Sequence, residues 1–420
     1  KKNNNAIFVV IDPYYTKTAK LADIHIKIRP GTDGALACAI MHNLYKYKFV
    51  DIDIDYLRKY TKDYDLLNNH LINKTPKWAM KISGVLEKDI EYLSKLIGKN
   101  KKTYIRLGYG FTRQRNGSFN MHAVTCIPTI TGSWKYKGGG AFYSNGDIYK
   151  IDKSLIEGFK FKDHNIRSLD QSRIGPILTG NREALKGGTE IKALFIQNTN
   201  PLVVAPETNL VIAGFRRNDL FTIVHEQFMT DTAKFADILL PATSFVEHND
   251  IYVSGGHQHI TLGPKIIKEI GNSWSNHKLI NKLSKKLGAD DELFNLSEIE
   301  LIDRTLKLSN ISNYEEIKKK KFIDMQPSFN EAHFLNGFGH SDKKFHFSPI
   351  WKKDCPEFNK KFNLPDHYKL IEKTCKSKPF KLVTAPAHNF LNSSFTETSS
   401  SLKKEIRPSL KIHPKDMENL

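Results

Sequence analysis

The chain has 420 residues, of which 40% are hydrophobic, and carries a formal net charge of +19, from 64 Lys and Arg against 45 Asp and Glu. With 25 Phe and 16 Tyr, this composition excludes a disordered chain, and no apolar run approaches the roughly 18 residues that a membrane span needs. The basic excess is Lys scattered among Asn and Ile, not a stripe interleaved with aromatic residues, so we expect a solvated surface and no nucleic-acid partner.

A short apolar strand at residues 7–11 opens the chain and belongs to a repeat. Residues 16–24 read TKTAKLADI and recur at residues 230–238 as TDTAKFADI, with seven of nine positions identical. At this offset of 214 positions, the strand at 7–11 corresponds to the apolar run at 221–224, and Asp12 corresponds to Glu226. Each copy therefore predicts a strand, an acid, a turn, a short helix and a second strand. The second strands are predicted at residues 24–28 and 238–240.

Each copy has the form of half a doubly wound α/β unit, in which ligands lie at the carboxyl ends of the strands. An acid at that position typically accepts hydrogen bonds from ribose hydroxyls, so two copies predict two nucleotide ends held in a pseudo-symmetric way. The alternative is that the repeated spacing serves helix packing and that the acid caps a helix. The repeat by itself leaves both interpretations open.

The next elements are helical. Residues 35–45 predict an apolar helix with Thr32 or Asp33 as its N-cap. Residues 78–98 predict two helices separated at Gly84.

Strands and loops follow further along the chain. Residues 102–108 predict a strand, residues 193–196 predict a buried strand, and Asn116-Gly117 marks a turn before another helix. The charged stretch at 351–378 is interrupted by prolines and predicts a linker. Residues 381–384 predict the start of a new strand.

The four cysteines are not arranged as metal ligands. None stands at C-x-x-C spacing, so neighbouring ligands for a zinc or iron–sulfur site are absent. Cys38 lies in an apolar helical run and is expected in the core. The segment His225-Glu226 lacks the second His of a zinc-binding H-E-x-x-H motif. We therefore assign no metal-ligating residue to this chain.

A series of short motifs runs through the chain in a fixed order. They are VVIDP at 9–13 with Thr18-Ala19 and Ala22-Asp23, RPGTD at 29–33, Trp78-Ala79 with 82–84, 108–110 with 116–117, 138–140, NTNP at 198–201, 232–242 followed by Glu247, and Thr384 with 391–395 and His413-Pro414. Each motif is weak alone. Together, by number, order and spacing, they resemble the molybdopterin oxidoreductase family in its dimethyl sulfoxide reductase branch.

The resemblance implies two molybdopterin guanine dinucleotides bound around one Mo or W ion. The first guanosine pocket would be lined by Asp12, Pro13, Tyr14 and Thr16 and closed by Gly31, Thr32 and Asp33. The residues near the metal end of the cofactor would be Tyr109, Gly110 and Arg113. The residues serving the second dinucleotide would be Asn198, Asn200, His225, Glu226, His248 and Asn276, with Thr384 and Asn392 contacting the cofactor from the C-terminal domain.

The residue types suit this ligand. Carboxylates accept hydrogen bonds from guanine N–H groups or ribose hydroxyls, and Asn both donates and accepts. Glycine turns let backbone N–H groups approach a pyrophosphate, and Arg113 would add a charged contact. The alternative for each residue is an ordinary structural role: Asp33 as a helix cap, Tyr109 in the core and Arg113 on the surface.

The expected fold is α/β, with interleaved doubly wound, Rossmann-like domains, mostly parallel sheets and the start of a β-rich C-terminal domain. We expect a first dinucleotide-binding domain at residues 1–130 and a second α/β domain, with the second repeat copy and the linker, at 131–378. A truncated molybdopterin-dinucleotide-binding β domain is expected at 379–420.

Two parts that the family usually has are expected upstream of Lys1: the cysteines of a [4Fe–4S] cluster and the residue that ligates Mo or W. None of the four cysteines stands at that ligand's place, so we expect no catalytic residue here and no turnover by this chain alone. The whole protein is expected to carry out two-electron redox or oxygen-atom transfer on a small molecule, with an iron–sulfur or other electron-transfer subunit. Cytoplasm and periplasm both remain open.

A non-catalytic relative of the large iron–sulfur subunit of NADH-quinone oxidoreductases is the competing interpretation. The strand-end acid and the segment RPGTD at 29–33 argue against it, because loss of the cofactor would relax these positions.

Overall fold

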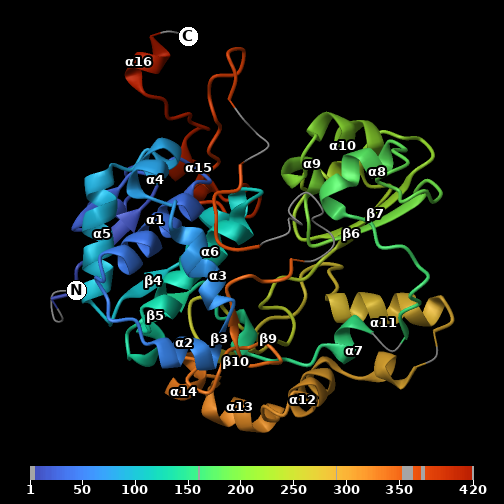
Figure 1. Ribbon diagram of the computed structural model, residues 1–420. Coiled ribbons are helices and arrows are strands. Elements are labelled where there is room, and N and C mark those ends of the chain that lie inside the picture. The colour runs from blue at the N-terminus through green and yellow to red at the C-terminus, as the bar shows by residue number, and fades with distance from the viewer. Residues whose placement is uncertain (1–4, 159–160, 290, 352–362, 370–373, 419–420) are drawn as a thin grey trace. The chain divides into compact units, whose positions relative to one another are not determined.

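The computed structural model describes residues 5–158, 161–289, 291–351, 363–369 and 374–418 (Figure 1). The chain forms two compact units, and it leaves the first unit and later returns to it. Unit 1 comprises Lys1–Asn145 and Gln326–Thr384, and unit 2 comprises Gly146–Met325 and Ala385–Leu420. The three domain ranges given above divide the chain by cofactor role and remain a prediction.

The part of unit 1 that the structure describes combines helices with three pairs of short parallel strands. Its helices are α1 (Asp33–Lys46), α2 (Ile54–Tyr60), α3 (Tyr64–Leu71), α4 (Pro76–Ser83), α5 (Glu87–Lys99), α6 (Gly117–Ile130) and α14 (Phe329–Ala332), with 3-10 turns η1 (Ala19–Leu21), η2 (Tyr109–Arg113) and η3 (Ser133–Lys135). Its strands are β1 (Val9–Ile11), β2 (Ile24–Ile26), β3 (Thr61–Lys62), β4 (Tyr104–Arg106), β5 (Gly140–Phe142) and β12 (Phe345–His346). β1 pairs with β2, β4 with β5 and β3 with β12.

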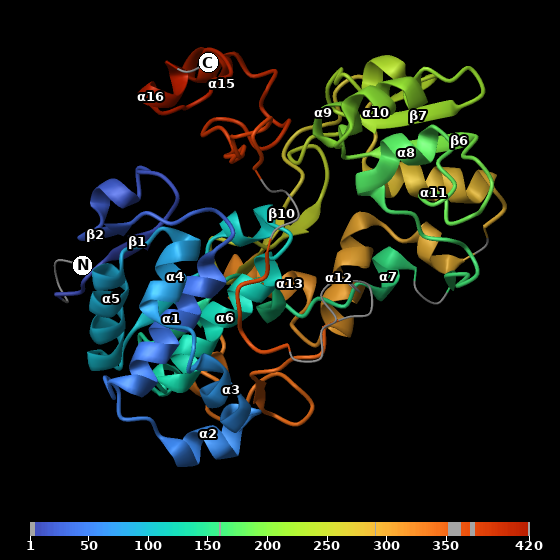
Figure 2. The same cartoon turned by 45° about the horizontal axis from the view of Figure 1, so that its top comes forward.

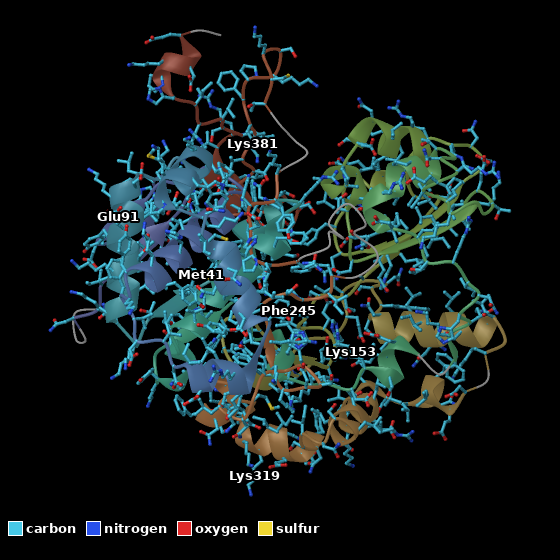
Figure 3. The ribbon with its side chains drawn as sticks, in the orientation of Figure 1. Met41, Glu91, Lys153, Phe245, Lys319 and Lys381 are labelled. Atoms are coloured by element: carbon cyan, nitrogen blue, oxygen red, sulfur yellow. The ribbon has the colours of Figure 1, made fainter. Side chains whose placement is uncertain are left out.

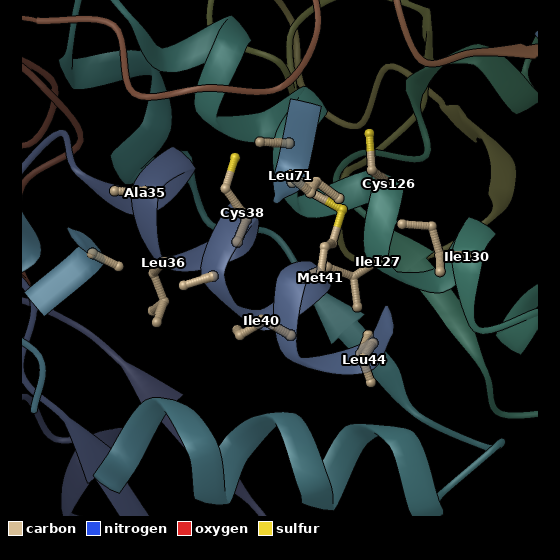
Figure 4. Close-up of a cluster of buried hydrophobic side chains, with 14 of the residues drawn as sticks. Ala35, Leu36, Cys38, Ile40, Met41, Leu44, Leu71, Cys126, Ile127 and Ile130 are labelled. Carbon is tan, nitrogen blue, oxygen red and sulfur yellow. The ribbon is translucent and has the colours of Figure 1, made fainter. Parts of the chain in front are cut away.

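Helix α1 lies in the core of unit 1 because its sequence is apolar on every side. Every residue from Gly34 to Leu44 is buried, and α3, α4, α5 and α6 pack against the helix (Figure 1). Figure 4 shows side chains of α1 and α6 meeting, with Cys38 among them, which confirms its predicted core position. In Figure 3, Met41 of α1 lies inside the unit, whereas Glu91 lies on the outer side of α5. A helix that is hydrophobic all round is a core helix.

The helices predicted in this region are confirmed. Thr32 is the N-cap residue of α1, although its hydroxyl donates to Arg29 O at 2.6 Å and does not cap the helix. Gly84 separates α4 from α5, and its φ of +76° explains why a glycine ends α4.

Residues 363–369 pack onto this core, which corrects part of the linker predicted at 351–378. Leu364 is only 5% exposed, and Lys74 Nζ lies 2.6 Å from Asp366 Oδ1. The prediction failed here because it rested on charge and proline content, whereas these side chains find partners almost 300 residues earlier in the chain. The parts of the predicted linker that lie outside the described residues are 352–362 and 370–373.

In its described residues, unit 2 contains one parallel and one antiparallel sheet. Its strands are β6 (Ala193–Gln197), β7 (Phe221–Glu226) and β8 (Ile238–Pro241) in the parallel sheet, and β9 (Asp250–Tyr252), β10 (His259–Gly263) and β11 (Phe322–Asp324) in the antiparallel sheet. Its helices are α7 (Ser154–Glu157), α8 (Ile174–Leu178), α9 (Pro201–Val204), α10 (Thr208–Phe215), α11 (Asn276–Lys286), α12 (Glu298–Leu308), α13 (Tyr314–Lys320), α15 (Ser399–Glu405) and α16 (Pro414–Met417), with 3-10 turns η4 (Gly146–Ile148), η6 (Gln171–Arg173), η7 (Ala233–Phe235) and η8 (Glu292–Asn295). Helices α8, α9 and α10 lie beside β6 and β7 (Figure 2), where residues of α8 and α10 bury the inner side chains of the sheet. No helix in the described ranges has both the length and the apolar character needed to cross a membrane.

The strand predicted at residues 381–384 does not form. These residues have no regular structure, and the described chain from 385 to 418 has two helices and one isolated bridge, between Leu391 and Ser394. Within the described part of the chain no strand pairs with 381–384, and an unpaired strand lacks the hydrogen bonds that would hold it. Lys381 (Figure 3) instead reaches Gln114, with Nζ 3.1 Å from Oε1.

Candidate functional site

The two copies of the repeat fold in the same register. In unit 1, β1 pairs in parallel with β2, with Val9 opposite Ile24. In unit 2, β7 pairs in parallel with β8, with Ile223 opposite Ile238. Val9 and Ile223 are 214 positions apart, and so are Ile24 and Ile238, which is the same offset that relates the two sequences. The predicted second strands are therefore confirmed, and the two strand pairs are aligned in the same way.

The hydrogen bonds of the turn also recur. In each copy a threonine Oγ1 accepts the N–H of the alanine three positions later, which starts a single 3-10 turn. An aspartate before the second strand accepts the N–H of a residue at the start of the first strand. The bonds are Ala19 N to Thr16 Oγ1 at 3.1 Å and Phe8 N to Asp23 Oδ2 at 2.8 Å in unit 1, and Ala233 N to Thr230 Oγ1 at 3.1 Å and Thr222 N to Asp237 Oδ2 at 2.6 Å in unit 2. The repeated sequence thus encodes one strand–turn–strand element twice.

In unit 1, the loops after β1 and β2 leave the same edge because the two strands are parallel. Asp12 follows β1, its N–H donates to Ile26 O at 3.2 Å, and its carbonyl accepts His25 Nε2 at 3.1 Å. Beyond β2 the chain turns at Gly31, whose φ is +75°, and enters α1 at Asp33. The predicted residues 12–16 and 31–33 therefore belong to one strand-end group.

Asp33 is a half-buried carboxyl group beside Asp12. Burial raises the pKa of Asp33 to about 6, its own backbone N–H opposes this rise, and the negative charge of Asp12 adds to it. The side chain of Asp12 also accepts the N–H of Tyr14 at 3.4 Å. Two carboxyl groups at one strand edge form a place that favours N–H and O–H donors.

We expect Asp33→Asn to increase the free energy of unfolding at about pH 8 and to leave it nearly unchanged at about pH 4. The pKa of an unfolded Asp is about 3.9, whereas the folded value is about 6. Between these values the folded state keeps a proton that the unfolded state has lost, so stability decreases as the pH rises. Asparagine does not titrate, so the variant does not lose stability in this way as the pH rises. Urea denaturation at both pH values measures the difference, with Asp55→Asn on exposed α2 as the control, and equal stability of wild type and variant at the higher pH would contradict it.

Tyr109, Gly110 and Arg113 lie in η2, directly after β4. Tyr109 is 56% exposed, with its ring centroid 4.9 Å from that of Tyr143, which rules out the alternative of a core residue. Arg113 is also exposed. No atom of the described chain lies within 4 Å of where a Cβ on Gly110 would stand, so the backbone is open to close approach there.

In unit 2, a relay of hydrogen bonds through Gln197 joins His225, near the end of β7, to Asn276, the first residue of α11. Gln197 Nε2 donates to His225 Nδ1 at 3.0 Å and to Asn276 Oδ1 at 3.0 Å. His225 is 2% exposed, and its Nε2 lies 3.1 Å from Trp274 O, so Nε2 donates and Nδ1 accepts. Both ring nitrogens of His225 are therefore used inside the protein, and Asn276 is the exposed end of the relay. Gln197 was missed, although it is the last residue of β6 and adjoins the predicted Asn198.

Asn200 serves a structural role in this unit. It is buried, and its Oδ1 accepts both the N–H of Thr232, at 3.3 Å, and the hydroxyl of Thr232, at 2.7 Å. These bonds tie the turn of the second repeat copy to the start of α9. Asn198 follows β6 with a φ of +55° and is exposed, so its side chain is available to a ligand.

Glu226 ends β7 in the position that Asp12 holds after β1. Its Oε1 accepts the N–H of Gln227 at 2.7 Å, which leaves further acceptor capacity on the carboxylate. His248 lies in the loop after β8, with Nδ1 2.9 Å from Thr243 Oγ1. Gln227 Nε2 in turn donates to Thr243 O at 2.8 Å, which connects the two loops.

Thr384 and Asn392 are not joined to either group. Both are exposed, and Asn392 has a φ of +54° in the turn closed by Leu391 and Ser394. In the described ranges, no hydrogen bond runs from their side chains to the strand-end residues. Over the same ranges, no set of three or more His, Cys, Asp and Glu side chains is placed to hold a metal ion.

The comparison with known proteins decides the family. The family model described as molybdopterin oxidoreductase matches residues 1–286. This chain belongs to the molybdopterin oxidoreductase family. The family and the enzyme class predicted from the motifs are thereby confirmed.

Relatives match the chain along its whole length. It is 35% identical over 99% of its residues to the probable oxidoreductase YoaE of Bacillus subtilis, and 27% identical over 100% of its residues to the F420-dependent formate dehydrogenase subunit alpha of Methanocaldococcus jannaschii. Acetylene hydratase from Pelobacter acetylenicus is similar in structure, with a TM-score of 0.77 at 16% identity over 100% of this chain, which confirms the mixed α/β fold. The chain spans 60%, 63% and 62% of these three proteins.

Proposed function

We propose that this chain binds bis(molybdopterin guanine dinucleotide) through its two strand-end groups. One guanosine end would bind at Asp12 and Asp33 in unit 1, and the other at Glu226, Asn198 and Asn276 in unit 2. The repeat is the observation that supports this proposal: each unit has the same parallel strand pair, the same threonine-capped turn and an acid at the carboxyl end of its first strand. Two matched elements suit a ligand with two matched nucleotide ends.

The residues fit this ligand in chemical type. The carboxylates accept hydrogen bonds from guanine N–H groups or ribose hydroxyls, and the asparagine amides donate and accept. The open backbone at Gly110 suits the approach of a pyrophosphate, and the exposed Arg113 suits its charge. The cofactor, when bound, supplies the redox chemistry at its Mo or W, and the residues of this chain hold and orient its nucleotide ends.

The activity belongs to the whole protein in this proposal. That protein would carry out two-electron redox or oxygen-atom transfer on a small molecule. The metal ligand and a [4Fe–4S] cluster would lie in the part of the relatives that this chain does not span, so the chain alone would not turn over. The whole protein would also have an electron-transfer partner. This part of the proposal is supported by a relative whose name, subunit alpha, places it in an enzyme of several subunits.

We expect the 420-residue chain to bind GDP, the nucleotide end of the cofactor, more tightly than ADP. A carboxylate at each strand end can accept the N1–H and 2-amino groups of guanine, and adenine lacks both donors. Loss of such bonds to a charged group corresponds to a difference of roughly tenfold or more in Kd. Isothermal titration calorimetry with each nucleotide measures affinity and stoichiometry. Two GDP molecules per chain are expected, and equal affinity for GDP and ADP would contradict the proposal.

A further inference from the structure

Two buried asparagines at the start of α6, the N-cap residue Asn116 and Asn120, bond to each other and to the loop that carries Asp33. Asn116 Nδ2 donates to Gly31 O at 2.8 Å, and Asn120 Oδ1 accepts the N–H of Gly34 at 3.0 Å. Asn120 Nδ2 completes the pair by donating to Asn116 Oδ1 at 3.1 Å. Both side chains are almost fully buried, at 0% and 1% exposed. Because each amide both donates and accepts, neither can be flipped without losing bonds.

This pair holds the loop at both ends. Gly31 and Gly34 flank Thr32 and Asp33, so the two asparagines bond on either side of the carboxyl group. A Cβ on Gly34 would stand 2.8 Å from Asn120 Oδ1 and 2.5 Å from Asp366 O, which shows how closely the backbone approaches these atoms. The N–H of Gly34 is also in the first turn of α1, where no carbonyl of the helix is available to accept it.

The same pair reaches the segment 363–369. The second hydrogen of Asn116 Nδ2 goes to Tyr368 O at 2.7 Å. This segment is held separately by the ion pair between Lys74 and Asp366. The loop at 31–34 is therefore tied, through one amide, to a segment anchored elsewhere on unit 1.

We propose that Asn116 and Asn120 are positioning residues of the unit 1 site, which hold Asp33 beside Asp12. Their bonds reach only backbone atoms of the loop, so they act through its shape and not by touching a ligand. The inference rests on the proposed function in one respect, that this site takes a guanosine end. The raised pKa of Asp33 is the measurable sign of its position, since it depends on burial and on the nearby Asp12.

The test uses the variants Asn116→Ser and Asn120→Ala in the full chain. Serine is a favoured N-cap residue, so Asn116→Ser keeps the start of α6 while it removes both donors of the amide. We expect the Asp33 titration midpoint, followed by carboxyl ¹³C NMR without ligand and assigned with Asp33→Asn, to fall from about 6 towards the ordinary value. Hydrogen exchange of the Gly34 amide should accelerate, and the affinity for GDP should fall, each roughly tenfold.

A purely structural role would lower the stability of the protein without moving the titration midpoint of Asp33. Asn68→Ala, on the exposed side of α3, is the matched control and should leave all three readouts at their wild-type values. If both asparagine variants keep the wild-type midpoint and the wild-type Gly34 exchange, the positioning role is wrong. If the wild-type chain fails to bind GDP, the proposed function fails instead, and titration and exchange still decide the positioning role.

Discussion

Asp12→Asn and Glu226→Gln are each expected to remove one of the two GDP sites. Each change replaces a carboxylate that accepts two donors with an amide that presents a donor of its own. Hydrogen bonds to charged groups contribute about 1.5–3 kcal/mol, so the affinity of the altered site should fall roughly 10- to 100-fold. Calorimetry should show the stoichiometry fall from two to one in each single variant. The double variant should lose both sites, because each unit holds one of the two acids.

Two exposed acids supply the controls for this experiment. Asp55→Asn in α2 and Glu315→Gln in α13 each remove one negative charge away from the strand ends and should leave both sites intact. If either control weakens GDP as much as the strand-end variants, the effect is one of net charge. If Asp12→Asn and Glu226→Gln leave the stoichiometry at two GDP per chain with unchanged affinity, the two acids do not bind the nucleotide.

Gly117→Ala is expected to destabilise the protein strongly, whereas Gly110→Ala is not. A Cβ on Gly117 would stand 1.8 Å from Phe111 O, and a backbone oxygen cannot move aside as a flexible side chain can. Either α6 or η2 must shift, and overpacking of this kind costs about 1–3 kcal/mol or more. A Cβ on Gly110 meets no described atom within 4 Å, so its cost should stay within about 0.5 kcal/mol.

Urea denaturation of the two alanine variants measures the contrast. The two glycines lie near each other in sequence, so Gly110 is the matched control for the loss of a glycine. Equal stability of the two variants would contradict the prediction, because it would show that α6 and η2 can move apart at Gly117 without a decrease in the free energy of unfolding. Because η2 carries Tyr109 and Arg113, a shift of this turn would also displace the residues predicted to lie near the metal end of the cofactor.

Much of the local architecture followed from the sequence alone. The repeat at an offset of 214 predicted two equivalent strand pairs, and their register and threonine turns agree with it. The apolar run at 35–45 predicted the core helix α1, and Gly84 predicted the end of α4. These features are local, because hydrophobic periodicity, turn residues and helix caps act over a few positions. The strand-end acids Asp12 and Glu226 could be named for the same reason.

The tertiary structure alone decided which polar side chains are used inside the protein. Asn116 binds Gly31, which is 85 positions away in sequence, and Gln197 orients His225, which is 28 positions away. No local sequence pattern predicts either contact. His225 and Asn200 are predicted to serve the second dinucleotide, and the fold shows that their side chains also make buried hydrogen bonds within the protein. Residues 363–369 join the core, and 381–384 form no strand, because both outcomes depend on partners distant in sequence. Burial and a neighbouring charge likewise make Asp33 a carboxyl group with a raised pKa. Such effects arise only when the folded chain brings distant groups together and excludes water from them.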